Sequence, residues 1–331
     1  MSSSSSSSSK DWGVAGVWNS SLKNMEIRAV QERDHLWASE LGKAPVDVFY
    51  HLAGTTPSNP PNYRSMRKFE AGNVFEWIVK LMFKRAGIMI DEEVHCKHQY
   101  SGLLEVTGRL DVLAGGKPDF STAIAELKAL DMPQVFIRAA EEMKFYFDTH
   151  YSGQILSPKP IEIKSLSSFM FEALLARKSA VQAHRMQLTH YLKALGFESG
   201  SILYICRDDL RMMEVPVMLE GKAEQEYKEA IELHSGYQKT KTLPPLEEPV
   251  VYDLDTGKFS ANWKVGYSMY LTKLYGLADQ AEFDEKYRSA PTKWNSTLKR
   301  FREGSKMTPL NLARMKEMSD AGFDVAKIAM S

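Results

Sequence analysis

The spacing of apolar residues along the chain predicts an alternation of helices and strands. Apolar residues recur at helical spacing in four segments, 25–42, 66–87, 119–150 and 168–197. Strand-like patterns mark four others, 92–100, 104–116, 160–165 and 200–217. The last of these is interpreted as a hairpin turned at Arg207-Asp208-Asp209. Proline, serine and asparagine predict a loop over 55–65.

This order of elements predicts an α/β fold with a mixed central β-sheet flanked by helices. A proline-rich stretch at 243–249 is interpreted as a boundary. The sequence is therefore divided into a disordered serine-rich tail over 1–24, a core over 25–250 and a small helical C-terminal extension over 251–331.

Composition and charge narrow the class of protein. In 331 residues, Lys+Arg and Asp+Glu both total 42, so the net charge is zero. A zero net charge gives no support for broad electrostatic binding of nucleic acid. The two cysteines, Cys96 and Cys206, exclude a disulfide framework and a four-cysteine metal site within one chain. The serine run at the start is no secretory signal, and no apolar stretch approaches the roughly 18 residues of a membrane span. We expect a cytoplasmic protein without a membrane partner.

The strand at 160–165, with the sequence PIEIKS, places two opposite charges side by side. Residues two apart share a face of a strand, so Glu162 and Lys164 should point one way and Ile161 and Ile163 the other. Taken alone, such a pair is most simply a surface ion pair. The rest of the chain changes this interpretation.

Two further acids precede this strand, Glu76 on a predicted helix and Asp111 on a predicted strand. With Glu162 they form a set of hard oxygen ligands that suits Mg²⁺ or Mn²⁺, and the backbone carbonyl of Ile163 would be a further ligand. Without a cation the acids should repel one another, and at least one pKa should rise. Lys164 would orient or deprotonate an attacking water, or stabilise the charge that develops during phosphodiester hydrolysis.

The motifs GRLD, IEIKS and QLTHY resemble, in this order, those of the PD-(D/E)XK nuclease superfamily. They are most similar to its RecB-like and lambda-exonuclease-like branch, which has a Q-x-x-x-Y motif, and the similarity covers roughly 25–250. One departure is Leu110, which stands where the family name has proline. The resemblance implies a restriction-endonuclease-like core in which the acids and Lys164 bind metal and hydrolyse DNA, while Gln187 and Tyr191 line the site and the DNA path.

The resemblance also implies partners and a cellular role. The partner is DNA, with Arg109 and Ser165 as further candidate contacts, and the activity is expected to be that of a nuclease, preferentially an exonuclease. This branch acts in recombination, repair or replication, often in phages and mobile elements, so a homo-oligomer or a recombination or replication protein is a further expected partner. Nothing in the sequence encodes an oligomer or a need for a DNA end.

Some relatives carry four cysteines around an iron–sulfur cluster. At the positions where three of these cysteines would stand, this chain has Ala44, Val265 and Ser268. We therefore expect no iron–sulfur cluster and expect hydrophobic packing to hold this end of the chain.

Three alternatives stay open at this point. A second E-x-K, Glu126 and Lys128, could be the catalytic pair, although its alanine- and leucine-rich surroundings favour helix. In the second alternative, the chain has a nuclease fold without catalytic activity and serves as a DNA-binding or assembly module. The third is a helical interaction protein whose motifs arose by chance.

Overall fold

The computed structural model describes residues 31–253 and 257–330, so the predicted tail at 1–24 lies outside the described residues. The chain forms two compact units. The first takes the described residues up to Gly42 together with Pro61–Ser235, and the second takes Lys43–Pro60 and the described residues from Gly236 onward. This division differs from the single boundary expected near 250, because a short early segment folds with the C-terminal part.

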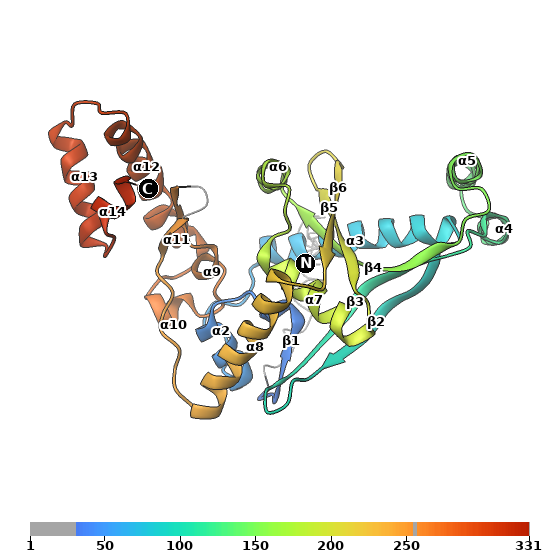
Figure 1. Ribbon diagram of the computed structural model, residues 1–331, viewed down its shortest axis with the longest axis horizontal. Helices are drawn as coiled ribbons and strands as arrows, with labels where there is room; N and C mark the ends of the chain where they lie inside the picture. Colours follow the sequence, from blue (N-terminus) through green and yellow to red (C-terminus); the bar gives the residue numbers. More distant parts are fainter. Residues whose placement is uncertain (1–30, 254–256, 331) are drawn as a thin grey trace, which may run out of the picture. The chain divides into compact units, whose positions relative to one another are not determined.

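A mixed sheet forms the centre of the first unit (Figure 1). Its six strands are β1 (His35–Trp37), β2 (Met89–His98), β3 (Glu105–Gly116), β4 (Leu156–Leu166), β5 (Ser199–Cys206) and β6 (Met212–Met218). The order is β1-β3-β4-β5-β6, with β2 also paired to β3. The β1–β3 and β4–β5 pairs are parallel and the others antiparallel. The predicted α/β fold with a mixed sheet is confirmed, and the all-helical alternative is wrong.

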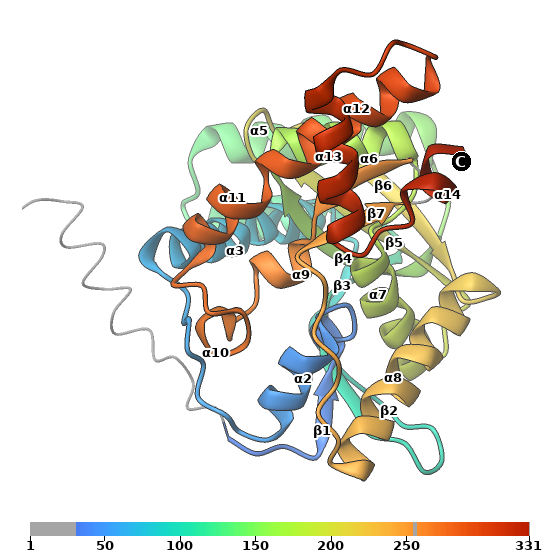
Figure 2. The same ribbon diagram turned by 90° about the vertical axis from the view of Figure 1, so that its left-hand side faces the viewer.

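Helices flank this sheet. They are α3 (Tyr63–Arg85), α4 (Phe120–Ala129), α5 (Gln134–His150), α6 (Ser168–Arg177), α7 (Gln182–Leu195) and α8 (Lys222–Thr240), the last of which runs on into the second unit. Figure 2 shows β3 and β4 between α3 and α7. The parallel β4–β5 pair requires a crossover, which α6 and α7 provide. Among the helices of the described residues, none is long and apolar enough to cross a membrane.

The two faces of β4 carry different side chains, as the alternation at 160–165 predicts. Ile161 and Ile163 pack with Val79 of α3 in a buried apolar cluster. Glu162 and Lys164 pair in register with Ile202 and Tyr204 of β5, and so lie on the other face. The ion pair is therefore directed into the space under α7 and is no ordinary surface pair.

The helix predicted over 25–42 is wrong for its described part. Residues 35–37 form β1, which pairs with β3, and Ala38–Glu40 form a short 3-10 helix, η1. Leu36 is fully buried opposite Val106, so burial against the sheet outweighs the helical spacing of the apolar residues. Gly42 does end the segment, at a place where a Cβ would lie 2.3 Å from that of Ala183.

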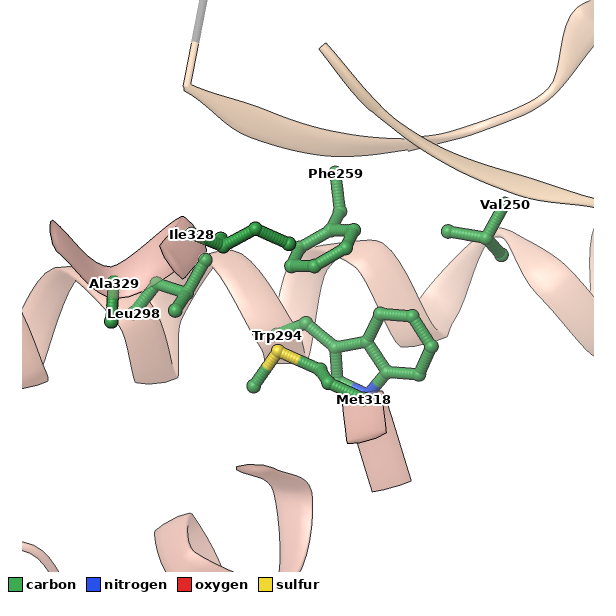
Figure 3. Close-up of a cluster of buried hydrophobic side chains, with 7 residues drawn as sticks. All are labelled: Val250, Phe259, Trp294, Leu298, Met318, Ile328 and Ala329. Carbon is green, nitrogen blue, oxygen red and sulfur yellow. The ribbon is translucent and has the colours of Figure 1, made fainter. Parts of the chain in front are cut away.

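The second unit combines short helices with a two-stranded sheet. Its elements are α2 (Pro45–Leu52), β7 (Val250–Asp253), β8 (Lys258–Ala261), α9 (Trp263–Gly266), α10 (Leu271–Tyr275), α11 (Gln280–Tyr287), α12 (Ser289–Arg302), α13 (Pro309–Asp320) and α14 (Val325–Met330). The sequence predicted helices here and missed the β7–β8 hairpin. Figure 3 shows one core of this unit, in which Trp294 and Phe259 meet edge to face, their ring centroids 5.2 Å apart.

Of the three positions at which the motif resemblance implied cluster cysteines, two are occupied by buried apolar side chains, Ala44 and Val265. The third, Ser268, is also buried, and its hydroxyl donates a hydrogen bond to the carboxylate of Asp47 over 2.8 Å. The other oxygen of Asp47 accepts from the backbone N–H of Met269 over 3.3 Å. A hydrogen-bonded carboxylate thus links α2 to the segment after α9.

Replacing Asp47 by alanine should lower the free energy of unfolding by about 1–3 kcal/mol, because buried polar partners would lose their acceptor. Denaturant unfolding followed by circular dichroism would measure this loss. Asp320→Ala is a matched control in the same unit, since Asp320 is an exposed partner of Lys316 and should matter little. Equal stability of the two variants would contradict the proposed link.

Candidate metal centre

The sheet forks at the point where the predicted acids meet. The β3–β4 ladder runs from Gly116/Leu156 to Val112/Ile161 and stops there, while β3 continues along β1 and β2 and β4 continues along β5. Just past the last pair, Asp111 Oδ2 accepts a hydrogen bond of 2.7 Å from the backbone N–H of Ile163. A side chain thus replaces the next rung of the ladder and places a carboxylate between the two strands.

Glu162 and Lys164 occupy the β4 side of this fork. Glu162 is fully buried, and its Oε1 accepts a hydrogen bond from the Lys164 ammonium. Its other oxygen, Oε2, has no hydrogen-bond partner among the described residues. A buried carboxylate oxygen without a donor is costly, so this atom marks a place where a cation or a proton is needed.

Burial and the charges of neighbouring acids raise the pKa values of the three acids. Burial, reinforced by the charge of Glu162, raises the pKa of Asp111 to about 8. Burial also raises the pKa of Glu162, against the opposing effect of Lys164. For Glu76 on α3, burial and the charge of Asp111 raise the pKa in the same way. The expected rise is confirmed for all three acids.

Lys164 stays charged in this environment. Burial alone would lower the pKa of its ammonium group, but the charges of Glu162 and Asp111 outweigh burial and raise it. A positive charge beside three acids is therefore suited to stabilising negative charge or to orienting a water molecule. Removing a proton from water would require a lower pKa.

Sequence reasoning missed a fourth acid, Glu93 on β2. Carboxylate oxygens of Glu76, Glu93 and Asp111 all lie within 4.8 Å of one another, close enough to share a metal ion. The backbone of Glu93 has φ +53°, a left-handed conformation that is unusual for a glutamate inside a strand. The only hint in the sequence is the run of three acids at 91–93, because a local backbone conformation of this kind leaves no periodic pattern.

The donor set fits a hard divalent cation. It consists of carboxylate oxygens, with the unpaired Oε2 of buried Glu162 beside Asp111, and it contains no thiolate or imidazole. Oxygen ligands of this kind suit Mg²⁺ or Mn²⁺. Ile163 contributes its N–H to Asp111, and the role of its carbonyl as a ligand stays a prediction.

A pocket of about 950 Å³ opens beside the acids. Its lining includes Glu76, Asp111, Gln187 and Tyr191, together with Arg109. Gln187 donates a hydrogen bond of 2.9 Å to the Tyr191 hydroxyl, so the two residues of the Q-x-x-x-Y motif act as one group. Tyr191 lies against β3 because the strand has Gly108 there, where a Cβ would come within 2.8 Å of the ring.

The remaining predicted residues lie in different surroundings. Arg109 Nη1 is 3.2 Å from Glu93 Oε2, at the rim of the pocket. Ser165 lies on the α3 side of β4, where a Cβ on Gly72 would be 3.6 Å from its hydroxyl. Glu126 and Lys128, the alternative E-x-K pair, lie exposed on helix α4. The helix favoured by their sequence context is confirmed, and this pair offers no strand-borne site.

The stability of the metal-free protein should fall as the pH rises. The pKa of Asp111 is about 8 in the folded chain against 3.8 for a free side chain, so its contribution is complete below pH 4 and is lost as the pH rises towards 8. The slope for one proton is at most about 1.4 kcal/mol per pH unit. Urea unfolding in EDTA at several pH values would measure it. Asp111→Asn should flatten the profile, and an unchanged slope would contradict the assignment.

Comparisons with known proteins give little information about this site. No family model and no curated protein matches the chain. Among solved structures, the crystal structure of SSO0001 is similar, with 13% sequence identity, 80% of this chain and 97% of that chain covered, and a TM-score of 0.43. A likeness at this level carries no argument, so the function must be inferred from the site itself.

Proposed function

We propose that this chain is a metal-dependent DNA nuclease with a restriction-endonuclease-like core of the PD-(D/E)XK type. The observation that carries the proposal is the fork between β3 and β4. There Asp111, Glu162 and Lys164 lie together, with Glu76 reaching them from α3. These four groups are far apart in the sequence and are the ones that the motif resemblance singled out.

The acids Glu76, Asp111 and Glu162 would hold Mg²⁺ or Mn²⁺. When bound, the ion supplies charge neutralisation at the phosphate and lowers the pKa of water. The chain's own groups do the rest. The Ile163 N–H fixes one oxygen of Asp111, and this leaves the other free to face the cation.

Lys164 would act on the reacting groups as an ammonium ion. Its bond to Glu162 Oε1 holds it beside the acids, and its raised pKa keeps it charged. From there it can donate a hydrogen bond to the attacking water or to a phosphate oxygen, where negative charge accumulates during hydrolysis. The Gln187–Tyr191 pair lines the adjoining pocket and would position the nucleic acid strand, with Arg109 at the rim.

We favour end-directed cleavage in recombination, repair or replication over internal cleavage, because the motifs resemble the exonuclease branch of the superfamily. The pocket, about 950 Å³, has room for a nucleotide or two beside the acids and is lined by Trp37 and Trp77, whose rings could stack on bases. The rim residue Arg109 adds a positive charge that would attract phosphate.

Digestion of end-labelled linear DNA and covalently closed circular DNA with Mg²⁺ would test this proposal. An exonuclease degrades the linear DNA and leaves the closed circle intact, whereas an endonuclease cuts both. Binding of linear DNA without cleavage, in Mg²⁺ and in Mn²⁺, would favour an idle DNA-binding or assembly module. In that case the nuclease proposal is wrong.

A further inference from the structure

A second buried lysine, Lys80 on α3, lies among the acids and has no place in the nuclease motifs. It is 7% exposed, and its ammonium group contacts Glu76 Oε1 over 2.5 Å and forms a hydrogen bond with Glu93 Oε1. Its neighbour one turn on, Lys84, makes the comparable pair with Glu92 over 2.5 Å, but that pair is exposed to solvent. Of the two α3 lysines that pair with β2, only Lys80 is therefore buried beside the acids, while Glu93 keeps a side-chain exposure of 39%.

Burying the Lys80 ammonium group has an energetic cost. Taking a charged group out of water is unfavourable unless it is well paired. Glu93 also adopts its left-handed backbone conformation, which strains a residue that has a Cβ. Arg109 holds the other oxygen of Glu93 at 3.2 Å. Lys80 and Arg109 thus each hold one oxygen of the Glu93 carboxylate.

We propose that Lys80 is a built-in cation that fills the second cation position of this centre, so that the site takes one divalent ion and not two. The inference rests on the metal centre of the proposed function. In two-metal sites the ions lie about 3.5–4 Å apart and share carboxylates. The Lys80 ammonium already lies between Glu76 and Glu93, where a second ion would take its ligands.

The charges support the same conclusion. Metal binding requires ionised carboxylates. With Glu76, Glu93, Asp111 and Glu162 all ionised, the two lysines, Lys80 and Lys164, leave two negative charges. One divalent cation neutralises them, and a second would leave the buried centre with two positive charges. Without Lys80, three negative charges remain, and two divalent ions leave only one positive charge. Arg109 is left out because its side chain is 55% exposed and is screened by water.

The number of bound Mn²⁺ ions tests this inference without DNA. Isothermal titration calorimetry, with electron paramagnetic resonance to count free Mn²⁺, should give one ion per wild-type chain. Lys80→Gln should bind two, with a second-site affinity at least about tenfold higher than any second site of the wild type. Lys84→Gln is the matched control and should bind one. Lys80→Gln combined with Glu93→Gln should return to one.

If Lys80→Gln does not fold, a second variant that keeps Lys80 still tests the inference. Glu93→Gln alone should still bind one Mn²⁺ with little change in affinity, because Glu93 is paired with Lys80. Binding of two Mn²⁺ ions by the wild type would overturn the inference, and so would binding of one Mn²⁺ ion by folded Lys80→Gln. A tenfold loss of Mn²⁺ affinity in Glu93→Gln would overturn it as well. Absence of Mn²⁺ binding in the wild type would overturn it together with the metal centre. Failure to cut DNA would defeat only the nuclease proposal.

Discussion

Replacing Asp111 by asparagine should slow Mg²⁺-dependent degradation of linear DNA by about 10³-fold or more. The substitution keeps the size of the side chain, and the amide oxygen can still accept the N–H of Ile163. It removes the negative charge at the centre of the fork, where Glu76 and Glu162 converge. The cation would then lose a carboxylate ligand. Release of labelled nucleotides, measured at saturating Mg²⁺, gives the rate.

Two further variants make this result specific. Glu126→Gln changes the other E-x-K pair, which is exposed on α4, and should leave the rate within about twofold. Lys164→Ala should lose activity by a similar factor to Asp111→Asn and still bind Mn²⁺, since lysine is no ligand. Equal rates in wild type, Asp111→Asn and Lys164→Ala would exclude the fork as the catalytic centre.

The β4 part of the site could be predicted from the sequence because one simple rule governs it. Alternation in a strand assigns Ile161 and Ile163 to one face and Glu162 and Lys164 to the other, and burial of the isoleucines against α3 keeps that register. The helical spacing of Gln187 and Tyr191 likewise predicts a shared face, and the two side chains are hydrogen-bonded. Local periodicity was sufficient for these residues.

Glu93 and Lys80 could not be predicted in this way. The position of Glu93 depends on a left-handed backbone conformation in β2, and that of Lys80 depends on how α3 lies over the strand. Both features arise from tertiary packing and leave no period in the sequence. The strand β1 was missed for a related reason, since three residues that pair with β3 look like part of a helix when read alone.

The second unit illustrates the same limit on a larger scale. Residues 43–60 fold with the C-terminal part of the chain, although residues 61–235 separate the two segments. Proline content marked 243–249 as a boundary, and these residues do form a loop. Composition cannot reveal that an early helix such as α2 joins the later elements through a contact like that of Asp47 with Ser268.

Trp294→Ala should cause the largest loss of stability in this second unit, about 3–5 kcal/mol. The indole is 6% exposed and packs with Phe259, Leu298 and Met318, as Figure 3 shows. Its Nε1 also donates a weak hydrogen bond of 3.4 Å to Glu317. Truncation to alanine leaves a cavity that five short elements, β7, β8, α12, α13 and α14, would have to close.

Phe301→Ala is the matched control for this prediction, because Phe301 lies on the same helix, α12, but is 42% exposed. Its loss should be about 1 kcal/mol or less. Urea unfolding followed by the fluorescence of the remaining tryptophans and by circular dichroism would measure both variants. Glu76, Glu93, Asp111 and Glu162, the four acids of the candidate metal centre, all belong to the first unit. Folded Trp294→Ala should therefore retain Mn²⁺ binding. Similar stabilities of the two variants would mean that the cluster around Trp294 does not hold this unit together.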